Sequence, residues 1–403
     1  MKFVSTQEST RSDDVGHRFS GFGGHVLFDP APSIDAGEAP SPLAELGVTD
    51  AEQLVAMAAV PGVLEELQAV ITGDVVAMVR RARATLPLER AELVGTPAEP
   101  DLALGVLPLT DEMVAALETM AFESIETEAL ELPGATNLIP YMQRIRSQGA
   151  RGTCVSFALT ALNEYVYRRL HPAVAVIDLS EQHLYYEIKL IDGAPAGCGT
   201  WQTKAVLALR DRGQCREHVW PYNMNPPCNN HGVRPAAARA NGLVFRRPTT
   251  AVPARSVQAY KSHMALGRPV TLSIPVYRSW YESAEVRRSG RITMRVGNEQ
   301  AVGGHAVCLV GYQDSPDSPG GGYFIVRNSW GTTWASASPY SGGYGTIPYR
   351  YITNEAMEAF TSVFRLTPGD DDFEEKEEAA AGETTVTIEV GSNVKVTIST
   401  KPA

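Results

Sequence analysis

The alternation of apolar and polar positions divides the chain into a helical N-terminal region and a longer region of mixed character. Between residues 49 and 86 apolar residues recur at helical spacing, which predicts a unit of three helices. Thr49 and Glu52 form a capping box ahead of the first apolar run, so we expect the first helix to begin there. A second, acidic helical pattern covers residues 111–131. We assign residues 49–135 as a helical pro- or regulatory region.

A mixed pattern begins near residue 136. A helical run at residues 156–170 precedes apolar runs of β-type at 306–312 and 323–327, and glycine-rich loops separate them. This pattern predicts one α+β domain over residues 136–366.

The two ends of the chain differ from this domain. Residues 1–48 are rich in Gly, Pro, Ser and Asp, which predicts a flexible segment. Residues 367–382 form an acidic linker, and residues 383–403 alternate apolar and polar positions around Gly-Ser-Asn, as in a β-hairpin. Because two strands alone are marginally stable, we expect the hairpin to dock on the domain or on a partner, or to stay loose.

The charge of the chain narrows the classes of partner. Its 403 residues carry a formal net charge of −11, and the acidic run from Asp370 to Glu378 supplies much of it. Without a basic stripe the chain lacks the clusters of Lys and Arg that bind a phosphate backbone, which argues against nucleic acid. No run approaches the ~20 apolar residues of a membrane span, and the first residues lack the apolar core of a secretion signal. We expect no membrane partner and a cytoplasmic protein, unless a signal has been trimmed from the chain.

The cysteines point to catalysis rather than to metal binding. There are five of them, an odd number that leaves at least one thiol free, and no CxxC or CxxH spacing suggests zinc. Cys154 precedes the helical run at 156–170, so we expect its sulfur at a helix N-terminus, where the dipole and free backbone N–H groups favour the thiolate. Taken alone, such a cysteine is more often a small buried apolar residue.

Three further residues, with Trp330 as a supporting residue, complete a candidate catalytic site. His305 opens an apolar strand after two glycines, and it can stabilise the thiolate of Cys154 and protonate a leaving group. Asn328 can accept the other imidazole N–H, and Trp330 can shield that bond from water. Gln148 can hold an oxyanion together with the backbone N–H of Cys154. Each residue alone also has a structural explanation, such as a turn at Asn328, but their order and spacing favour the chemical one. This chemistry needs no metal and no organic cofactor.

Over residues 136–366 the chain resembles the papain-like cysteine peptidases. The segments QGARGTCVSF, GHAVCLVGY and NSWGTTW match the family's cysteine, histidine and asparagine motifs, and LSEQ and WPY match two supporting ones. His305 follows Cys154 by 151 residues, close to the family's spacing of ~130 to 150. The resemblance implies a two-lobed fold, with Cys154 on a helical lobe, His305 and Asn328 on a β-rich, barrel-like lobe, and peptide bound between them. It also implies that Gln148 contributes to an oxyanion hole.

Several cysteine positions depart from the family pattern. Arg151 stands where many members have a cysteine, and Glu187 stands where another half-cystine commonly falls. We therefore expect two family disulfides to be absent and Cys198 to lack its usual partner, which suits a reducing compartment. Cys215 and Cys228 flank WPY and can still pair, more readily outside the cytoplasm.

Other departures concern the cleft. Cys308 lies in an apolar strand and is expected to be buried and inert, and Val155 replaces the tryptophan that usually follows the nucleophile. The family's Gly-Gly that pairs with the substrate backbone is Gly199-Thr200-Trp201 here, so we assign no substrate-binding residues.

The N-terminal region is a candidate inhibitor. In many relatives a prodomain lies through the cleft until it is removed, and the helices at 49–86 and 111–131 are candidates for that role, with residues 131–134 as a cleavage region. The alternative is a helical module that packs on the enzyme or binds a partner.

We therefore expect a cysteine peptidase, made as a zymogen, that hydrolyses peptide bonds of peptide or protein substrates. One alternative is an acyl-transfer or single-substrate processing enzyme on the same fold. Another is a catalytically silent peptide-binding protein, against which the presence of all four chemical residues weighs.

Overall fold

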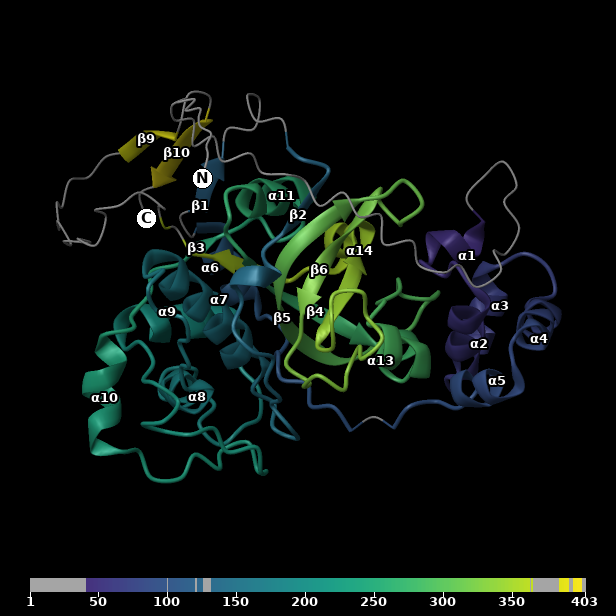
Figure 1. Cartoon of the computed structure of the whole chain (residues 1–403), viewed down its shortest axis with the longest axis horizontal. Helices are drawn as coiled ribbons and strands as arrows, with labels where there is room; N and C mark the ends of the chain where they lie inside the picture. Colours follow the sequence, from purple (N-terminus) through teal and green to yellow (C-terminus); the bar gives the residue numbers. More distant parts are fainter. Residues whose placement is uncertain are drawn as a thin grey trace, which may run out of the picture. The chain divides into compact units, whose positions relative to one another are not determined.

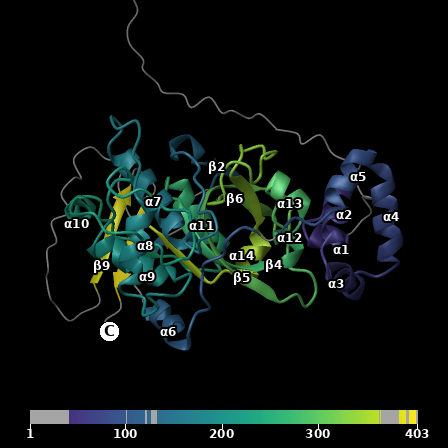
Figure 2. The same ribbon diagram turned by 90° about the horizontal axis from the view of Figure 1, so that it is seen from below.

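The computed structural model describes residues 41–99, 101–119, 122–125, 132–362, 364, 384–390 and 394–400. The main domain of these residues has a helical lobe beside a mainly antiparallel sheet (Figure 1). In the view turned by 90°, α7, α8 and α9 again lie to one side of β4, β5 and β6 (Figure 2). The α+β, two-lobed prediction is confirmed.

The helical lobe is organised around helix α7. Its helices are α7 (Cys154–Leu170), α8 (Glu181–Lys189), α9 (Gln202–Asp211) and α10 (Ala236–Leu243). Every α7 residue from Cys154 to Val166 is buried, because the helix packs against α8 and α9 and against strand β5 of the other lobe. The predicted helix at 156–170 is confirmed, and it starts two residues earlier, at the candidate nucleophile.

The β-rich lobe is built on strand β5 (Ala301–Asp314), the longest strand of the described residues. β5 pairs antiparallel with β4 (Val270–Tyr277) and with β6 (Gly322–Arg327), so both predicted strands are confirmed. The remaining elements of this lobe are β2 (Ala135–Asn137), β3 (Thr250–Ala251), β7 (Tyr344–Pro348), β8 (Glu358–Thr361), the 3-10 helix η1 (Ile139–Tyr141), α11 (Val257–Ala265), α12 (Arg278–Tyr281), α13 (Ala284–Ser289) and α14 (Tyr349–Glu355).

The N-terminal unit has five helices, and the middle three confirm the three helices predicted over residues 49–86. They are α1 (Pro42–Glu45), α2 (Ala51–Ala59), α3 (Val63–Val70), α4 (Val75–Thr85) and α5 (Leu88–Val94). α1 falls in the segment predicted to be flexible. The predicted capping box is shifted by one residue: Asp50 caps α2 by accepting a bond from the Gln53 amide, and Gln53 Oε1 accepts one from the Thr49 amide. The motif pairs Asp50 with Gln53 instead of Thr49 with Glu52.

The helix predicted over residues 111–131 is too long. Helix α6 covers Asp111–Thr119, and strand β1 (Phe122–Ile125) follows. β1 pairs antiparallel with β10 (Val394–Thr400), which pairs with β9 (Thr384–Val390). The predicted C-terminal hairpin is therefore confirmed, and it docks on β1, whose backbone groups pair with those along the edge of β10. The predictions for residues 1–40 and for the linker at 367–382 lie outside the described residues.

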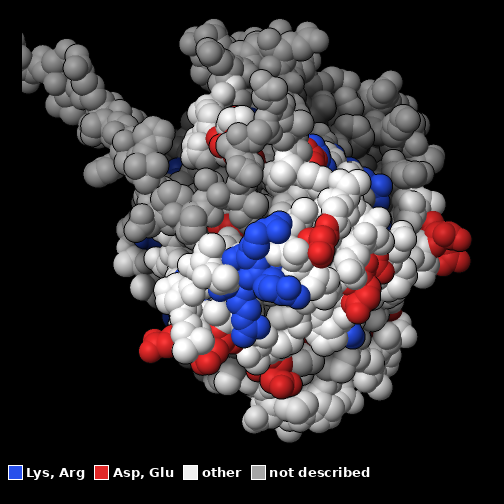
Figure 3. Space-filling view, turned by 90° about the vertical axis from the view of Figure 1, so that its right-hand side faces the viewer, with Lys and Arg blue, Asp and Glu red and all other residues white. Residues whose placement is uncertain are grey.

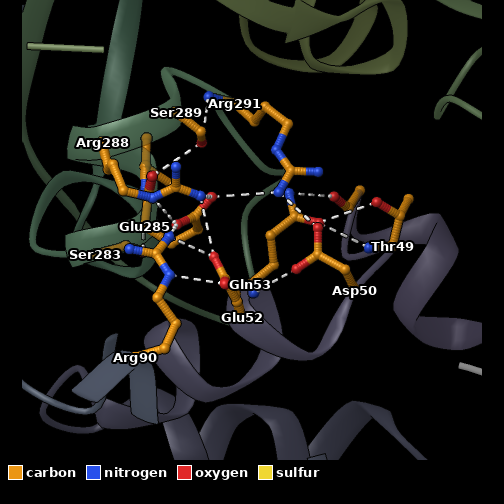
Figure 4. A network of polar contacts seen from close by, with 12 residues as sticks. Thr49, Asp50, Glu52, Gln53, Arg90, Ser283, Glu285, Arg288, Ser289 and Arg291 are labelled. Atoms are coloured by element: carbon orange, nitrogen blue, oxygen red, sulfur yellow. Dashed lines mark hydrogen bonds and ion pairs between the residues drawn. The ribbon is translucent and has the colours of Figure 1, made fainter. Parts of the chain in front are cut away.

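Ion pairs join the N-terminal unit to α13 (Figure 4). Glu52 of α2 binds Arg90 of α5 at 2.6 Å and Arg288 of α13 at 3.0 Å. Arg288 also binds Glu285, whose side chain is fully buried, at 2.8 Å. The hydrogen bond from Arg90 lowers the pKa of Glu52. The Glu52 carboxylate therefore forms one ion pair within the helical unit and another with the main domain.

Basic residues gather on one face of the molecule. Seen from the side where α1 to α5 lie in Figure 1, the surface carries a compact cluster of Lys and Arg side chains among scattered acidic ones (Figure 3). The exposed arginines of this unit are Arg80, Arg81 and Arg83 on α4. The cluster does not extend into a stripe across this face. No described helix is both long and apolar enough to cross a membrane.

Candidate active site

The sulfur of Cys154 lies at the start of α7. Thr153 is the N-cap residue, and the Ala306 amide of β5 donates a hydrogen bond of 3.4 Å to the sulfur. Cys154 is fully buried. This burial raises the pKa of the thiol to about 12, although the surrounding backbone amides act in the opposite direction.

His305 is held by Asn328 and Trp330. The imidazole Nε2 lies 2.8 Å from Asn328 Oδ1, which also accepts a 2.8 Å bond from the Ser329 amide. Because that oxygen can only accept, Nε2 carries the proton and Nδ1 is left as the basic nitrogen. Trp330 stacks on the imidazole with ring centroids 4.4 Å apart. Burial lowers the pKa of His305 to about 4, against the effect of the Asn328 bond.

The basic nitrogen of His305 is Nδ1. His305 Nδ1 is buried and makes no hydrogen bond with the described residues. The next residue of β5, Ala306, contacts the Cys154 sulfur. His305 therefore lies next in the chain to a residue that contacts the Cys154 sulfur, at the point where β5 passes the start of α7.

Gln148 completes the group of four predicted residues. Its side chain is buried, and Ser329 Oγ donates a 2.6 Å bond to its Oε1. This bond leaves the Nε2 group as the donor, and it donates to the Arg151 carbonyl at 2.8 Å and to the Ala103 carbonyl at 3.1 Å. The structure thus brings Gln148 to the loop that precedes Cys154.

A segment of the N-terminal region, residues 101–108, covers this site. The amides of Gly105 and Val106 donate to the Gly304 carbonyl, each at 3.0 Å. The Thr200 amide donates to the Gly105 carbonyl at 2.9 Å, and the Leu107 amide donates to the Thr200 carbonyl at 3.1 Å. The segment is therefore hydrogen-bonded to both lobes, one on each side of Cys154.

Gly105 makes this close approach possible. A Cβ atom at this position would lie 2.3 Å from the Gly152 carbonyl oxygen, two residues before the nucleophile. The segment that covers the site, residues 101–108, lies between the two predicted helical stretches at 49–86 and 111–131. The sequence signal for this segment is weak, since it is a single glycine within a short apolar run.

Comparisons with known proteins agree with this geometry. Residues 136–349, more than half of the chain, match the model of the papain family of cysteine proteases. The chain belongs to the papain family. Family membership accounts for the two lobes.

Three similar papain-family proteins illustrate the extent of the likeness. An uncharacterized peptidase C1-like protein of Acanthamoeba polyphaga mimivirus is 26% identical over 52% of this chain and 66% of that protein. Fruit bromelain of Ananas comosus is 27% identical over half of each chain. The crystal structure of xylellain, a cysteine protease from Xylella fastidiosa, shares the fold with a TM-score of 0.55 and 24% identity, covering 65% of this chain and 96% of that one. The chain spans only half to about two thirds of the length of these two curated relatives.

The structure settles the pairing of the cysteines. Cys198 lacks the partner that is usual in the family, as expected, and forms a disulfide with Cys228 instead, so the pairing of Cys215 with Cys228 that the sequence allowed does not occur. Cys215 and Cys308 are buried free thiols. Cys228 reaches Cys198 because its loop folds over the loop before Cys154, where Gly152 N contacts the Cys228 sulfur at 3.4 Å. Since disulfides persist in oxidising compartments, the cysteine pattern no longer argues for a reducing one.

Sequence reasoning missed two residues beside the nucleophile loop. Arg151, read only as a lost cysteine, is fully buried, and Tyr222 hydrogen-bonds the loop from the side. A charged residue within the QGARGTC motif was the available signal, because a buried arginine is rare unless its donors are satisfied.

Proposed function

We propose that the protein is a cysteine peptidase that hydrolyses peptide bonds and is latent in the chain as described. Cys154 is the nucleophile, His305 the general base and acid, and Asn328 the residue that orients His305. Gln148 donates to the oxyanion. The observation that carries the proposal is the buried Nδ1 of His305, which makes no hydrogen bond with the described residues. The Asn328 bond leaves that nitrogen basic, and the next residue, Ala306, contacts the Cys154 sulfur.

The reaction follows from these four groups. The Cys154 thiol gives its proton to His305 Nδ1, and the thiolate attacks the carbonyl carbon of the scissile bond. The tetrahedral oxyanion accepts bonds from Gln148 Nε2 and from the Cys154 amide. The imidazolium then protonates the leaving amine as the C–N bond breaks, which leaves a thioester. Water, deprotonated by His305, attacks the thioester, and collapse of the second tetrahedral intermediate releases the acid and regenerates the thiol.

Latency follows from what residues 101–108 occupy. The Ala103 carbonyl accepts the bond from Gln148 Nε2 that an oxyanion would need, and Gly105 lies against the nucleophile loop. Burial also favours the neutral thiol and the neutral imidazole, since it raises the pKa of Cys154 and lowers that of His305. Withdrawal of the segment admits water and substrate, which lowers the cost of the thiolate–imidazolium pair.

The test is hydrolysis of a fluorogenic peptide before and after limited proteolysis of the full-length chain. We expect little turnover before, turnover after, and none in either state for Cys154→Ala. Wild-type chain that turns over no peptide in either state, with a thiol that fails to react, would contradict the proposal.

A further inference from the structure

We propose that Arg151 is a positioning residue that holds Gln148 in place for oxyanion stabilisation. The inference rests on the proposed function, and it concerns a residue that takes no part in the chemical steps above. Arg151 lies on the loop between Gln148 and Cys154. It stands where a cysteine would give a disulfide in many papain-like chains.

The guanidinium of Arg151 is buried without a carboxylate partner. It donates to Gln182 Oε1 of α8 and to the Cys228 carbonyl, both at 2.7 Å, and to the Asn223 carbonyl. No ion pair to Arg151 occurs among the described residues, and burial lowers its pKa. A buried, unpaired cation is costly, so an apolar residue of the same length would serve packing better. What the arginine adds is a rigid fork that joins three separate segments.

The backbone of Arg151 sets the orientation of the Gln148 side chain. The Arg151 carbonyl accepts the 2.8 Å bond from Gln148 Nε2, while Ser329 holds the Oε1 side. Together the two bonds fix the amide plane. A substitution of the Arg151 side chain keeps the backbone carbonyl but can shift its position. Such a shift would rotate the Gln148 side-chain amide, which is the oxyanion donor.

Tyr222 provides a second link between Arg151 and the same loop. The guanidinium carbon lies 5.2 Å from the centroid of the Tyr222 ring. The Tyr222 hydroxyl donates to the Gln148 carbonyl at 2.9 Å and lies 2.6 Å from Thr153 Oγ1. Arg151 thus packs on the Tyr222 ring, and the Tyr222 hydroxyl contacts the loop both before Arg151, at Gln148, and after it, at Thr153.

The Cys198–Cys228 disulfide connects Arg151 to the loop that contains Thr200. The Cys228 carbonyl accepts from Arg151, and Cys228 is bonded to Cys198. Cys198 precedes Gly199 and Thr200, and Thr200 pairs with the covering segment. Arg151 is therefore linked to Cys198 through its hydrogen bond to the Cys228 carbonyl and through the Cys198–Cys228 disulfide. A cysteine at position 151 would make that link by a disulfide of its own.

The effect of losing Arg151 should fall on kcat. The oxyanion exists only in the transition state and the intermediates, so a misplaced donor lowers kcat and leaves KM nearly unchanged. Removing an oxyanion-hole donor costs about 10² to 10³ in kcat in comparable sites. We expect Arg151→Met to lower kcat by about 10- to 100-fold, because the donor is displaced rather than deleted.

A double-mutant cycle tests the inference directly. Full-length wild type, Arg151→Met, Gln148→Ala and the double variant are activated by the same limited proteolysis and compared in kcat and KM. If Arg151 acts through Gln148, Arg151→Met costs little further in the Gln148→Ala background. Equal loss of kcat in both backgrounds, or a loss confined to KM, would overturn the inference. Arg239→Met, at an exposed site on α10, is the matched control and should behave as wild type.

Folding is controlled separately. If Arg151→Met is not recovered folded, Arg151→Lys takes its place in the same double-mutant cycle. Lysine keeps the positive charge but lacks the planar guanidinium with its several donors. Wild-type chain that is inactive and has an unreactive Cys154 would contradict the proposed function. Active wild type with an additive cycle would contradict only the role of Arg151.

Discussion

The side-chain amide of Gln148 donates a 3.1 Å hydrogen bond to the carbonyl of Ala103, a residue 45 positions earlier in the chain. This bond ties the candidate oxyanion donor to a segment that also contacts Gly304 and Thr200 on the two lobes. The Gln148 side-chain amide is therefore in place as a candidate oxyanion donor, but the Ala103 carbonyl already accepts its hydrogen bond. That combination supports the proposal that the chain is latent while residues 101–108 lie on the candidate site.

Gly105→Val should release the covering segment. The new side chain begins with a Cβ atom 2.3 Å from the Gly152 carbonyl, so it must push residues 101–108 away from the nucleophile loop. Overpacking of this kind costs about 1 to 3 kcal/mol, which corresponds to an uncovered population raised roughly 5- to 150-fold. The rate at which an epoxysuccinyl peptide labels Cys154 in the intact chain should rise accordingly.

Gly134→Val is the matched control for this release. A Cβ atom at Gly134 meets nothing within 4 Å, and the residue also precedes the main domain. Its labelling rate should equal that of wild type. Slower or unchanged labelling of Gly105→Val would show that the segment does not limit access.

Asn328→Ala should weaken turnover without abolishing it. The variant loses the acceptor that orients His305, but Trp330 still stacks on the ring. We expect kcat to fall by about 10- to 100-fold, less than the loss in Cys154→Ala, because general acid–base catalysis is impaired rather than removed. Steady-state kinetics on the activated chain measures this. A Cys154→Ala chain that retained wild-type turnover would refute the assignment of the nucleophile.

The sequence predicts the candidate catalytic residues but not the segment that covers them. Cys154, His305, Asn328 and Gln148 lie in motifs whose residue types and spacing are set by the chemistry. Residues 101–108 have no such constraint, since they bind the lobes mainly through backbone groups that every residue carries.

The error in the N-terminal region and the unpredicted disulfide have related causes. The helical period continued past residue 119, but pairing with β10 makes residues 122–125 a strand, so tertiary contacts override the local pattern. The Cys198–Cys228 bridge depends on how a loop folds over Arg151, and loop paths leave no period in the sequence.

Glu52→Gln should loosen the N-terminal unit. The substitution removes the carboxylate that Arg90 and Arg288 share, and it leaves two guanidinium groups without that partner. Charge-assisted hydrogen bonds contribute about 1.5 to 3 kcal/mol each, so we expect the free energy of unfolding to fall by about 1 to 3 kcal/mol. Chemical denaturation measures the change. Glu92→Gln, at an exposed site on α5, is the control, and an equal effect of both substitutions would argue against the network.

His263 should make stability depend on pH. Burial, assisted by Arg268, lowers its pKa to about 3 from 6.5. The unfolded chain therefore binds one more proton than the folded chain between these values, and stability falls as the pH falls. Between pH 6.5 and 5 the wild type should lose about 2 kcal/mol more than His263→Gln. His218→Gln, at an exposed site, should follow the wild type, and parallel curves for wild type and His263→Gln would contradict a neutral buried imidazole.

The most direct test of the account is intact-mass spectrometry of the reduced full-length chain after brief exposure to an epoxysuccinyl peptide probe, before and after limited proteolysis. Cys154→Ala is treated in parallel. The account predicts one adduct, at Cys154, that forms slowly on the intact chain and rapidly once residues 101–108 are cut away from the cleft. The absence of an adduct in both states, or an adduct that persists in Cys154→Ala, would contradict a latent peptidase with Cys154 as its nucleophile.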